Sequence, residues 1–148
     1  MGLDIQAFER LRPGQEDKDW HLYQPEGVPD RSDGIAGWYA SDGESFRFRA
    51  GSYSGYNRWR DWLCKTFLGV NANEAWSDPD RFAGRPFIEL INYSDCEGFF
   101  GPVTSAKLAK DFADHAPAPD SGEYAAIYAD WSKAFALAAR GGGIVYLT

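Results

Sequence analysis

FRFRAGSYSGYNRWRDWLCKTF, residues Phe46 to Phe67, changes along its length from the period of a strand to the period of a helix. Its first four residues alternate aromatic and basic side chains, so a strand here carries two phenyl rings on one face and two guanidinium groups on the other. Apolar side chains then recur at spacings of three and four, which places them on one side of a helix. They are Tyr56, Trp59, Leu63 and Phe67.

The turn between this strand and this helix is a candidate binding site. Gly51 and Gly55 permit tight or left-handed backbone, and the hydroxyl of Ser52 or Ser54 can accept a hydrogen bond from the free amides of the first helical turn. Those amides and the nearby arginines predict a site for an anionic group such as a phosphate. The arginines are Arg47, Arg49, Arg58 and Arg60. The alternative is ordinary core architecture with solvated arginines.

Composition indicates one acidic domain that is rich in aromatic residues. The chain has 148 residues and a net charge of −7, so its electrostatic field repels nucleic acid and no direct binding to DNA or RNA is expected. A partner with a basic surface fits this charge, and an acidic protein can also compete for a nucleic-acid channel. Aromatic residues make up 16% of the chain, which predicts a core packed with rings or an aromatic surface that a partner covers.

Cysteine, histidine and hydropathy patterns indicate neither a metal site nor a membrane segment. Cys64 lies within the helical pattern, whereas Cys96 lies between two acids in a predicted loop. Neither cysteine is spaced with His21 or His115 as zinc ligands are, so no metal is predicted. No stretch reaches the length of a transmembrane span and the N-terminus lacks the pattern of a signal peptide, so the predicted location is the cytoplasm.

Four segments have the pattern of β-structure. Gly2 to Leu11 alternates apolar and polar residues and predicts a first strand. Trp38 to Arg49 predicts a hairpin with a DG dipeptide at its tip. Pro86 to Ile91 is short and apolar and predicts a buried strand, and Ile144 to Leu147 predicts a closing strand.

Three segments have the apolar stripe of a helix, and two irregular excursions separate the regular elements. The helices are predicted at Tyr56 to Leu68, Pro102 to His115 and Glu123 to Ala139. The excursions, residues 12–37 and 69–84, are rich in proline, glycine and polar residues. Within the second, Ser77 to Pro79 has the pattern of a cap and first turn, which predicts a single helical turn that reaches Phe82. The predicted fold is α+β: a single domain, residues 1–148, with a small, mostly antiparallel sheet packed against about three helices.

The residues around the turn, together with a second polar loop at Asn92 to Gly101, suit a nucleotide-like or phosphorylated small molecule. Aromatic rings stack on bases, guanidinium groups hold phosphates, and carboxylates accept hydrogen bonds from ribose hydroxyls. The predicted ligand-binding residues are Arg47, Arg49, Tyr53, Tyr56, Asn57, Arg58, Asp95 and Glu97. Tyr56 and Trp59 also lie on the apolar stripe, so they are candidates for the core as well.

Enzyme motifs are absent from the sequence. It contains no GxSxG, HExxH, GxxxxGK[ST] or GxGxxG arrangement, so no cofactor and no catalytic residue is predicted. Acid and base chemistry would need Glu89 to converge with Asp95 or Glu97. Cys96 would be a nucleophile only if His115 or a helix N-terminus lowered its pKa.

Four stretches resemble a family of small bacteriophage and prophage proteins that has no established activity. They are MGLDIQAF at the start, FRAGSYSGYNRWRDWL, ELINYSDCEGFFGPVTSAKLAKDF, and YADWSKAFALAARGGGIVY near the end. The resemblance spans most of the chain except residues 12–34 and 69–84. It implies an accessory protein made in the cytosol of an infected bacterium, where small acidic proteins counter host defence.

Three functions follow from the residues and the resemblance. The first is a protein that binds a nucleotide-like signal and sequesters it from host immunity. The second is an acidic inhibitor that binds a host defence complex directly, as anti-CRISPR proteins do. The third is a small hydrolase that uses Glu89, Asp95 and Glu97. A homodimer is compatible with all three.

Overall fold

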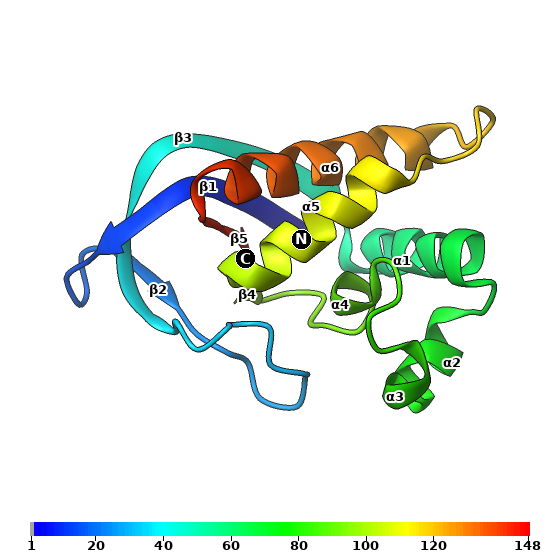
Figure 1. Ribbon diagram of the computed structural model, residues 1–148, viewed down its shortest axis with the longest axis horizontal. Helices are drawn as coiled ribbons and strands as arrows, with labels where there is room; N and C mark the ends of the chain where they lie inside the picture. The colour runs from blue at the N-terminus through cyan, green and yellow to red at the C-terminus, as the bar shows by residue number, and fades with distance from the viewer. Residues whose placement is uncertain (1) are drawn as a thin grey trace.

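One antiparallel sheet runs through the molecule, with the strand order β2-β3-β1-β5-β4 (Figure 1). The structure, a computed structural model, describes residues 2–148. Its strands are β1 (Leu3–Pro13), β2 (Trp20–Leu22), β3 (Gly37–Gly51), β4 (Gly98–Phe100) and β5 (Ile144–Leu147). All neighbouring strands pair antiparallel, and together with the helices this confirms the predicted α+β class.

Three long helices and three short ones occur within residues 2–148. The long helices, all predicted from the sequence, are α1 (Tyr53–Leu68), α5 (Pro102–Asp114) and α6 (Glu123–Gly141). The short helices are α2 (Ala72–Ser77), α3 (Pro79–Phe82) and α4 (Ile88–Ile91). Helices α5 and α6 run side by side along the sheet, and α1 to α4 gather at one end of the molecule (Figure 1).

The strand, turn and helix at residues 46–67 form as predicted. In β3 the two phenyl rings of the alternation are partly buried and the two arginines are exposed. Ser52 caps α1, because its hydroxyl accepts a hydrogen bond from the amide of Gly55 at 3.0 Å. Gly69 then ends the helix in the left-handed conformation, with φ of 74°.

The predicted hairpin in this region is wrong, because β3 passes through the DG dipeptide as one strand. Ser45 pairs with Phe8, and Asp42 pairs with Arg10. Two residues of β3 therefore face one residue of β1 between these pairs, which is a β-bulge. Gly43 lies in the bulge with φ of 77°, a conformation that glycine adopts without strain. A bulge bends and twists a strand locally, and β3 curls along its length in Figure 1.

The strand predicted at Pro86 to Ile91 is also wrong, because these residues form a turn followed by α4. Phe87 has a positive φ of 65°, and its amide donates a hydrogen bond to Asp111 Oδ2 at 3.0 Å. This turn sends the chain away from the sheet. A short apolar run is compatible with either a buried strand or a buried helical turn, so its composition alone does not separate them.

Short elements lie in the segments that the sequence predicts to be mostly irregular. The excursion at residues 12–37 contains β2, and the one at residues 69–84 contains α2 and also α3, which confirms the helical turn predicted there. The polar loop Asn92 to Gly101 ends in β4, whose residues are fully enclosed. Strands of three residues are too short to show a period in the sequence. Their conformation depends on pairing with neighbouring strands of the sheet.

Most of the aromatic residues pack into the core between the sheet and the helices. Tyr56, Trp59 and Trp131 are 0% exposed, and the rings of Trp59 and Trp131 stack with their centroids 5.9 Å apart. A second, smaller cluster lies on the other face of the sheet, under β2. Its buried members are Phe8, Leu22, Phe99 and Ile144. A core packed with rings therefore accounts for much of the aromatic composition.

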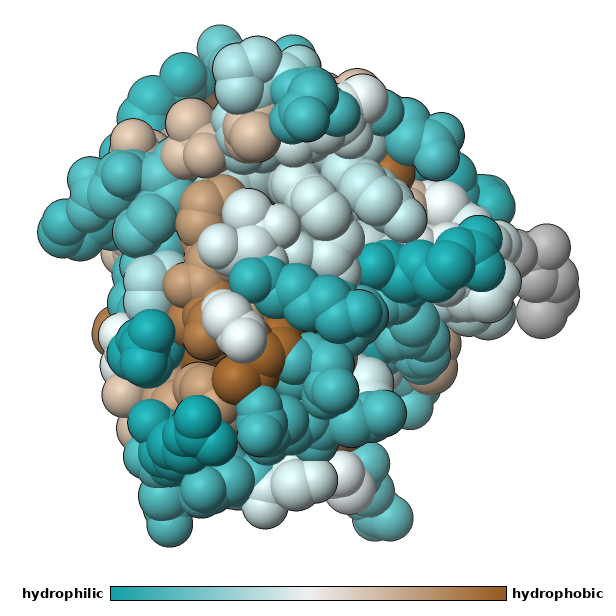
Figure 2. All heavy atoms as spheres, turned by 90° about the vertical axis from the view of Figure 1, so that its right-hand side faces the viewer, coloured by the Kyte–Doolittle hydropathy of each residue, from teal (hydrophilic) through white to brown (hydrophobic). Residues whose placement is uncertain are grey.

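Few large apolar side chains are exposed in the described part of the chain. Figure 2 shows one end of the molecule, which is mostly hydrophilic around a small apolar area. Among residues 2–148 the exposed large apolar side chains are Trp76, at 40%, and Val103, at 72%. No helix in this range combines the length and apolarity that crossing a membrane requires.

Candidate functional site

Two adjoining cavities open between α1, α2 and the loop that precedes β4, and we call them together the groove. The basic cavity has a volume of about 620 Å³ and contains the cations Arg58 and Lys65. The acidic cavity, of about 480 Å³, contains the carboxylates Glu26, Asp95 and Glu97. Asn57 and Trp76 line both cavities. Each volume lies in the range of small-molecule sites.

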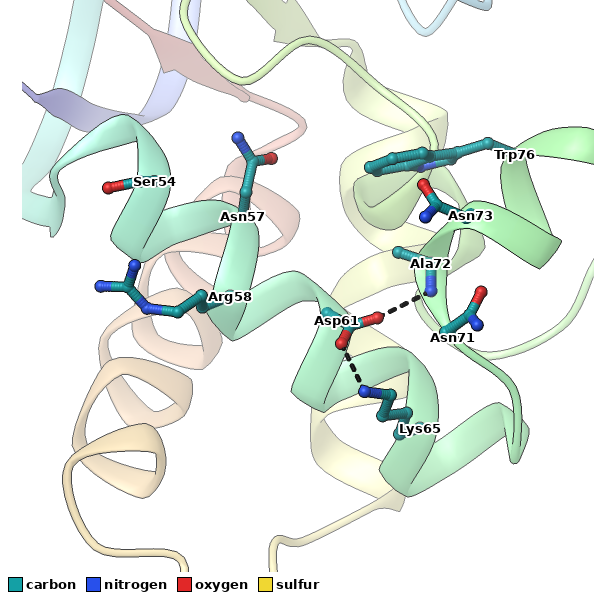
Figure 3. Close-up of a pocket in the computed structure, with 9 residues that line it drawn as sticks. All are labelled: Ser54, Asn57, Arg58, Asp61, Lys65, Asn71, Ala72, Asn73 and Trp76. Atoms are coloured by element: carbon teal, nitrogen blue, oxygen red, sulfur yellow. Dashed lines mark hydrogen bonds and ion pairs between the residues drawn. The ribbon is translucent and has the colours of Figure 1, made fainter.

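Trp76 is the aromatic wall of the groove, and its ring is held in place. The indole Nε1 donates a hydrogen bond to the carbonyl oxygen of Ile91 at 2.8 Å. The guanidinium carbon of Arg60 lies 5.6 Å from the ring centroid. Figure 3 shows the indole extending from α2 toward Asn57 on α1, above Ala72. An exposed ring that is already fixed binds a flat ligand at a low cost in conformational entropy.

Arg60 lies beneath the groove and connects its walls. The side chain is 3% exposed, and its Nη1 donates hydrogen bonds to the carbonyl oxygens of Ile91 at 3.1 Å and Tyr93 at 2.7 Å. Its Nη2 donates to Asn57 Oδ1, and its guanidinium carbon lies 4.7 Å from the ring centroid of Tyr56. The buried cation thus orients Asn57 and fixes the end of α4 next to α1.

Asp61 joins α1 to α2 at the wall of the basic cavity. Its Oδ1 accepts a hydrogen bond from the amide of Ala72 at 2.9 Å, and its Oδ2 pairs with Lys65 at 2.7 Å (Figure 3). The Lys65 hydrogen bond and the amide of Ala72 lower the pKa of this carboxyl group. Arg58 is exposed and projects from α1 away from Trp76, so its side chain must turn to reach a ligand that lies on the indole.

Two carboxylates in the acidic cavity are oriented by neutral partners. Asn57 Nδ2 donates to Asp95 Oδ2 at 2.8 Å, and the hydroxyl of Tyr23 donates to Glu97 Oε2 at 2.6 Å. This hydrogen bond to Glu97 raises the pKa of Tyr23 to about 12. Ser94 shapes the loop, because its hydroxyl accepts hydrogen bonds from the backbone amides of residues 96 and 97 at 3.2 and 3.1 Å.

The structure brings half of the predicted ligand-binding residues together. Asn57, Arg58, Asp95 and Glu97 line the groove. Tyr56 does not line it, because its ring is 0% exposed and stacks on Trp131 with centroids 5.6 Å apart. The side chain is therefore a core residue, and it meets the groove only through Arg60.

The other three predicted residues lie outside the groove. Arg47 and Arg49 project from β3 toward Asp4 on β1, with ion pairs of 3.8 and 2.6 Å. Arg49 is the main cause of the lowered pKa of Asp4. Tyr53 is partly buried against the main core. These exposed arginines both pair with the carboxylate of Asp4, and neither lines the groove.

Of the residues proposed for acid and base chemistry, Glu89 lies apart from Asp95 and Glu97. Glu89 pairs with Lys107 at 2.7 Å, and Lys107 also pairs with Asp111 at 2.6 Å. This cluster holds α4 against α5, whereas Asp95 and Glu97 line the acidic cavity. Cys96 is exposed beside them, and the ring of His115 packs instead against aromatic residues of α1 and the turn before α4. Glu89 is therefore not placed to act together with Asp95 or Glu97.

Sequence reasoning missed several residues that shape the groove. Trp76, Lys65, Asn71 and Tyr23 were outside the predicted set, and Arg60 was included only as a possible anion ligand. One signal was available: Asn71 precedes Glu74 by three residues, a common start of a helix, and its side chain caps α2 through the Glu74 amide at 2.9 Å. That pattern predicts α2 and so places Trp76 on a helix rather than in a loop.

Neither metal clustering nor comparison with known proteins identifies the groove. Within residues 2–148 no group of three or more His, Cys, Asp or Glu side chains is arranged to hold a metal ion. The chain matches no protein-family model, and no curated protein and no solved structure matches it. The function proposed below therefore rests on the geometry and chemistry of the groove and on the sequence resemblance.

Proposed function

We propose that this protein binds a phosphorylated, nucleotide-like small molecule in the groove. The observation that supports this most is the position of Trp76, a fixed and exposed indole between two cavities of different charge. One is lined by two exposed cations and the carboxylate Asp61, and the other by three carboxylates and the buried Arg60. A nucleotide has matching parts: a flat base, an anionic phosphate and polar groups that donate hydrogen bonds.

The base contributes most of the affinity by stacking on Trp76. Stacking of a base on an aromatic side chain contributes about 1–3 kcal/mol and tolerates different bases, because every base has a π face. Asn57 and Asn73 lie beside the indole, and their amides can meet polar groups at the edge of the ligand (Figure 3).

The phosphate binds at the basic cavity, where Arg58 and Lys65 are exposed. Hydrogen bonds from an ionised donor to a phosphate are stronger than those between neutral groups. The carboxylates of the acidic cavity repel an anion, so they orient the ligand with its phosphate away from them. Asp95 and Glu97 then accept hydrogen bonds from hydroxyl or amino groups of the ligand.

The resemblance to bacteriophage proteins supports a biological role for this binding. In an infected bacterial cytosol, a protein that holds a nucleotide immune signal tightly and returns it unchanged would act as a sponge. The net charge of −7 favours a free nucleotide over a nucleic acid, because a long polyanion meets the field of the whole molecule.

Thermal unfolding in the presence of nucleotides tests the proposal. We expect a nucleotide or cyclic dinucleotide at about a hundred times its Kd to add about 2.7 kcal/mol to the free energy of unfolding, a shift of several degrees. Trp76→Ala should lose the shift. Trp38→Ala is the matched control, because Trp38 stacks on His21 and does not line the groove, and this variant should keep the shift.

Two results would contradict this proposal. An equal shift in both tryptophan variants would place the ligand elsewhere on the molecule. No shift with any nucleotide would favour the protein inhibitor, whose binding should depend on acidic residues in residues 12–34 and 71–80 and should be recovered by affinity capture with a defined defence complex.

A further inference from the structure

The acidic cavity contains carboxylate hydrogen-bond acceptors that the binding of a nucleotide as such does not require. We infer that it reads the base, and that it selects bases with an amino group on the edge that faces Asp95 and Glu97. The inference rests on the proposed function and adds a specificity to it. Guanine, adenine and cytosine carry such an amino group, whereas uracil presents a carbonyl oxygen at the corresponding position.

Hydrogen bonds within the protein orient the two carboxylates before a ligand binds. Arg60 fixes Asn57, and Asn57 Nδ2 holds Asp95 Oδ2 at 2.8 Å. Tyr23 holds Glu97 Oε2 at 2.6 Å. One oxygen of each carboxylate is engaged by these side chains, and the other can accept a hydrogen bond from a ligand. Neither carboxylate has an ion-pair partner within 4.0 Å among residues 2–148, so their charge is not neutralised locally.

At the floor of the same cavity, a buried polar atom without a hydrogen-bond partner gives independent support for a polar ligand. Arg60 lines this cavity and is 3% exposed, and its Nε has no hydrogen-bond partner among residues 2–148. Buried polar groups are nearly always paired in folded proteins. A polar ligand edge with an acceptor beside its amino donor supplies what this floor lacks.

Charge explains why a carbonyl is rejected and an amino group is accepted. An ionised carboxylate only accepts hydrogen bonds, so an amino group pairs with it while a carbonyl oxygen leaves it unpaired and faces its negative charge. Hydrogen bonds to charged groups contribute enough that losing one weakens binding by at least about tenfold. Stacking on Trp76 is the same for both kinds of base, so the difference arises at the carboxylates.

Titration calorimetry with matched nucleotides tests this inference. Cytidine and uridine monophosphates differ at the position where an amino group replaces a carbonyl oxygen, and guanosine and inosine monophosphates differ by one amino group. We expect the amino-bearing member of each pair to bind at least about tenfold more tightly. In Asp95→Asn/Glu97→Gln the preference should fall below about threefold, because an amide can donate as well as accept.

A matched control and three outcomes separate the two proposals. Glu16→Gln/Asp17→Asn makes the same change of charge at exposed acids outside the groove and should keep the preference. Equal binding of cytidine and uridine monophosphates would overturn the inference and leave nucleotide binding intact, with the carboxylates on the shared ribose. A preference that survives in the amide variant would also overturn it. No binding of any nucleotide would overturn the proposed function and this inference together.

Discussion

Arg60 is a buried cation without a carboxylate partner in the described part of the chain, residues 2–148. Its donors go instead to the backbone carbonyls of Ile91 and Tyr93 and to the side chain of Asn57. The carbonyl at the C-terminal end of α4 carries partial negative charge, which favours a cation there. A single side chain therefore stabilises the turn after α4 and orients a residue of the groove.

Replacement of Arg60 by methionine should destabilise the protein. Methionine fills a similar volume but leaves buried carbonyl oxygens without donors, so we expect the free energy of unfolding to fall by about 2–4 kcal/mol. Urea denaturation measures this change, and Arg12→Met, at an exposed position on β1, should stay within about 0.5 kcal/mol of the wild type. Equal stability of the two variants would show that Arg60 does not hold the turn.

At the scale of single residues, the sequence predicted which face of a strand or helix each side chain occupies, but not which distant residues it contacts. The alternation in β3 and the stripe on α1 are confirmed, because period alone determines which face each side chain occupies. Tyr56 shows the limit of this reasoning. It lies both on the apolar stripe and next to the capped end of α1, and only the position of Trp131 on α6 assigns it to the core.

At the scale of elements, the excursion at residues 12–37 caps a helix that lies far along the chain. Asp33 accepts hydrogen bonds from the amide of Thr104 at 2.9 Å and from its hydroxyl at 3.0 Å. These groups belong to the first turn of α5, which has no side-chain cap from its own N-cap residue, Gly101. The excursion is therefore fixed to the fold where it meets α5.

Replacement of Asp33 should measure the contribution of this cap. Loss of a helix cap costs about 1 kcal/mol, and alanine adds strain because Asp33 has φ of 55°. We expect Asp33→Ala to lower the free energy of unfolding by about 1–2 kcal/mol in urea denaturation. Asp33→Asn keeps an acceptor and tolerates this backbone conformation, so it should lose less than half as much. Equal losses would argue against the cap.

The link between α1 and α2 should depend on pH through Asp61. Its pKa is lowered below the ordinary value of 3.8 in the folded protein, first by Lys65 and then by the amide of Ala72. The stability it contributes is therefore complete above pH 3.8 and is lost as the pH falls through the folded pKa.

Asp61→Asn removes this titration. We expect the variant to unfold more easily than the wild type near pH 6, and the difference between the two to shrink as the pH falls below 3.8. Urea denaturation at several pH values measures this difference. A difference that stays constant with pH would contradict the lowered pKa of Asp61.

Element prediction failed where a distant partner overrides a local pattern. The DG dipeptide and the apolar run at residues 86–91 are ordinary signals for a hairpin and a strand. In the fold, β1 continues past the dipeptide and keeps β3 extended, and Asp111 on α5 holds the backbone of Phe87 in a turn. Neither partner is near in sequence, so no local pattern indicates it.

At the scale of the whole molecule, the groove draws on four parts of the chain that are distant in sequence. Tyr23 comes from the first excursion, Asn57 from α1, Trp76 from the second excursion and Asp95 from the polar loop. The sequence predicted a site at α1 and the polar loop, and the structure places these two segments together. The sequence did not predict the groove walls that the two excursions form, because the side chains of these segments show neither a helical nor a strand period.

Two pairs of cations distinguish the groove from the site expected at the strand and the turn. Arg47 and Arg49 lie on β3 and share Asp4, whereas Arg58 and Lys65 line the basic cavity. The first pair would bind the phosphate if the ligand lay over the exposed face of the sheet. The second pair binds it if the ligand lies on Trp76.

Calorimetric titration of both double variants with the nucleotide that stabilises the wild type most is the most direct test. We expect Arg58→Ala/Lys65→Ala to weaken binding by at least about tenfold and Arg47→Ala/Arg49→Ala to stay within about threefold of the wild type. Thermal unfolding without ligand confirms that each variant is folded. Loss of binding in the β3 variant, with unchanged affinity in the groove variant, would contradict the groove as the ligand site.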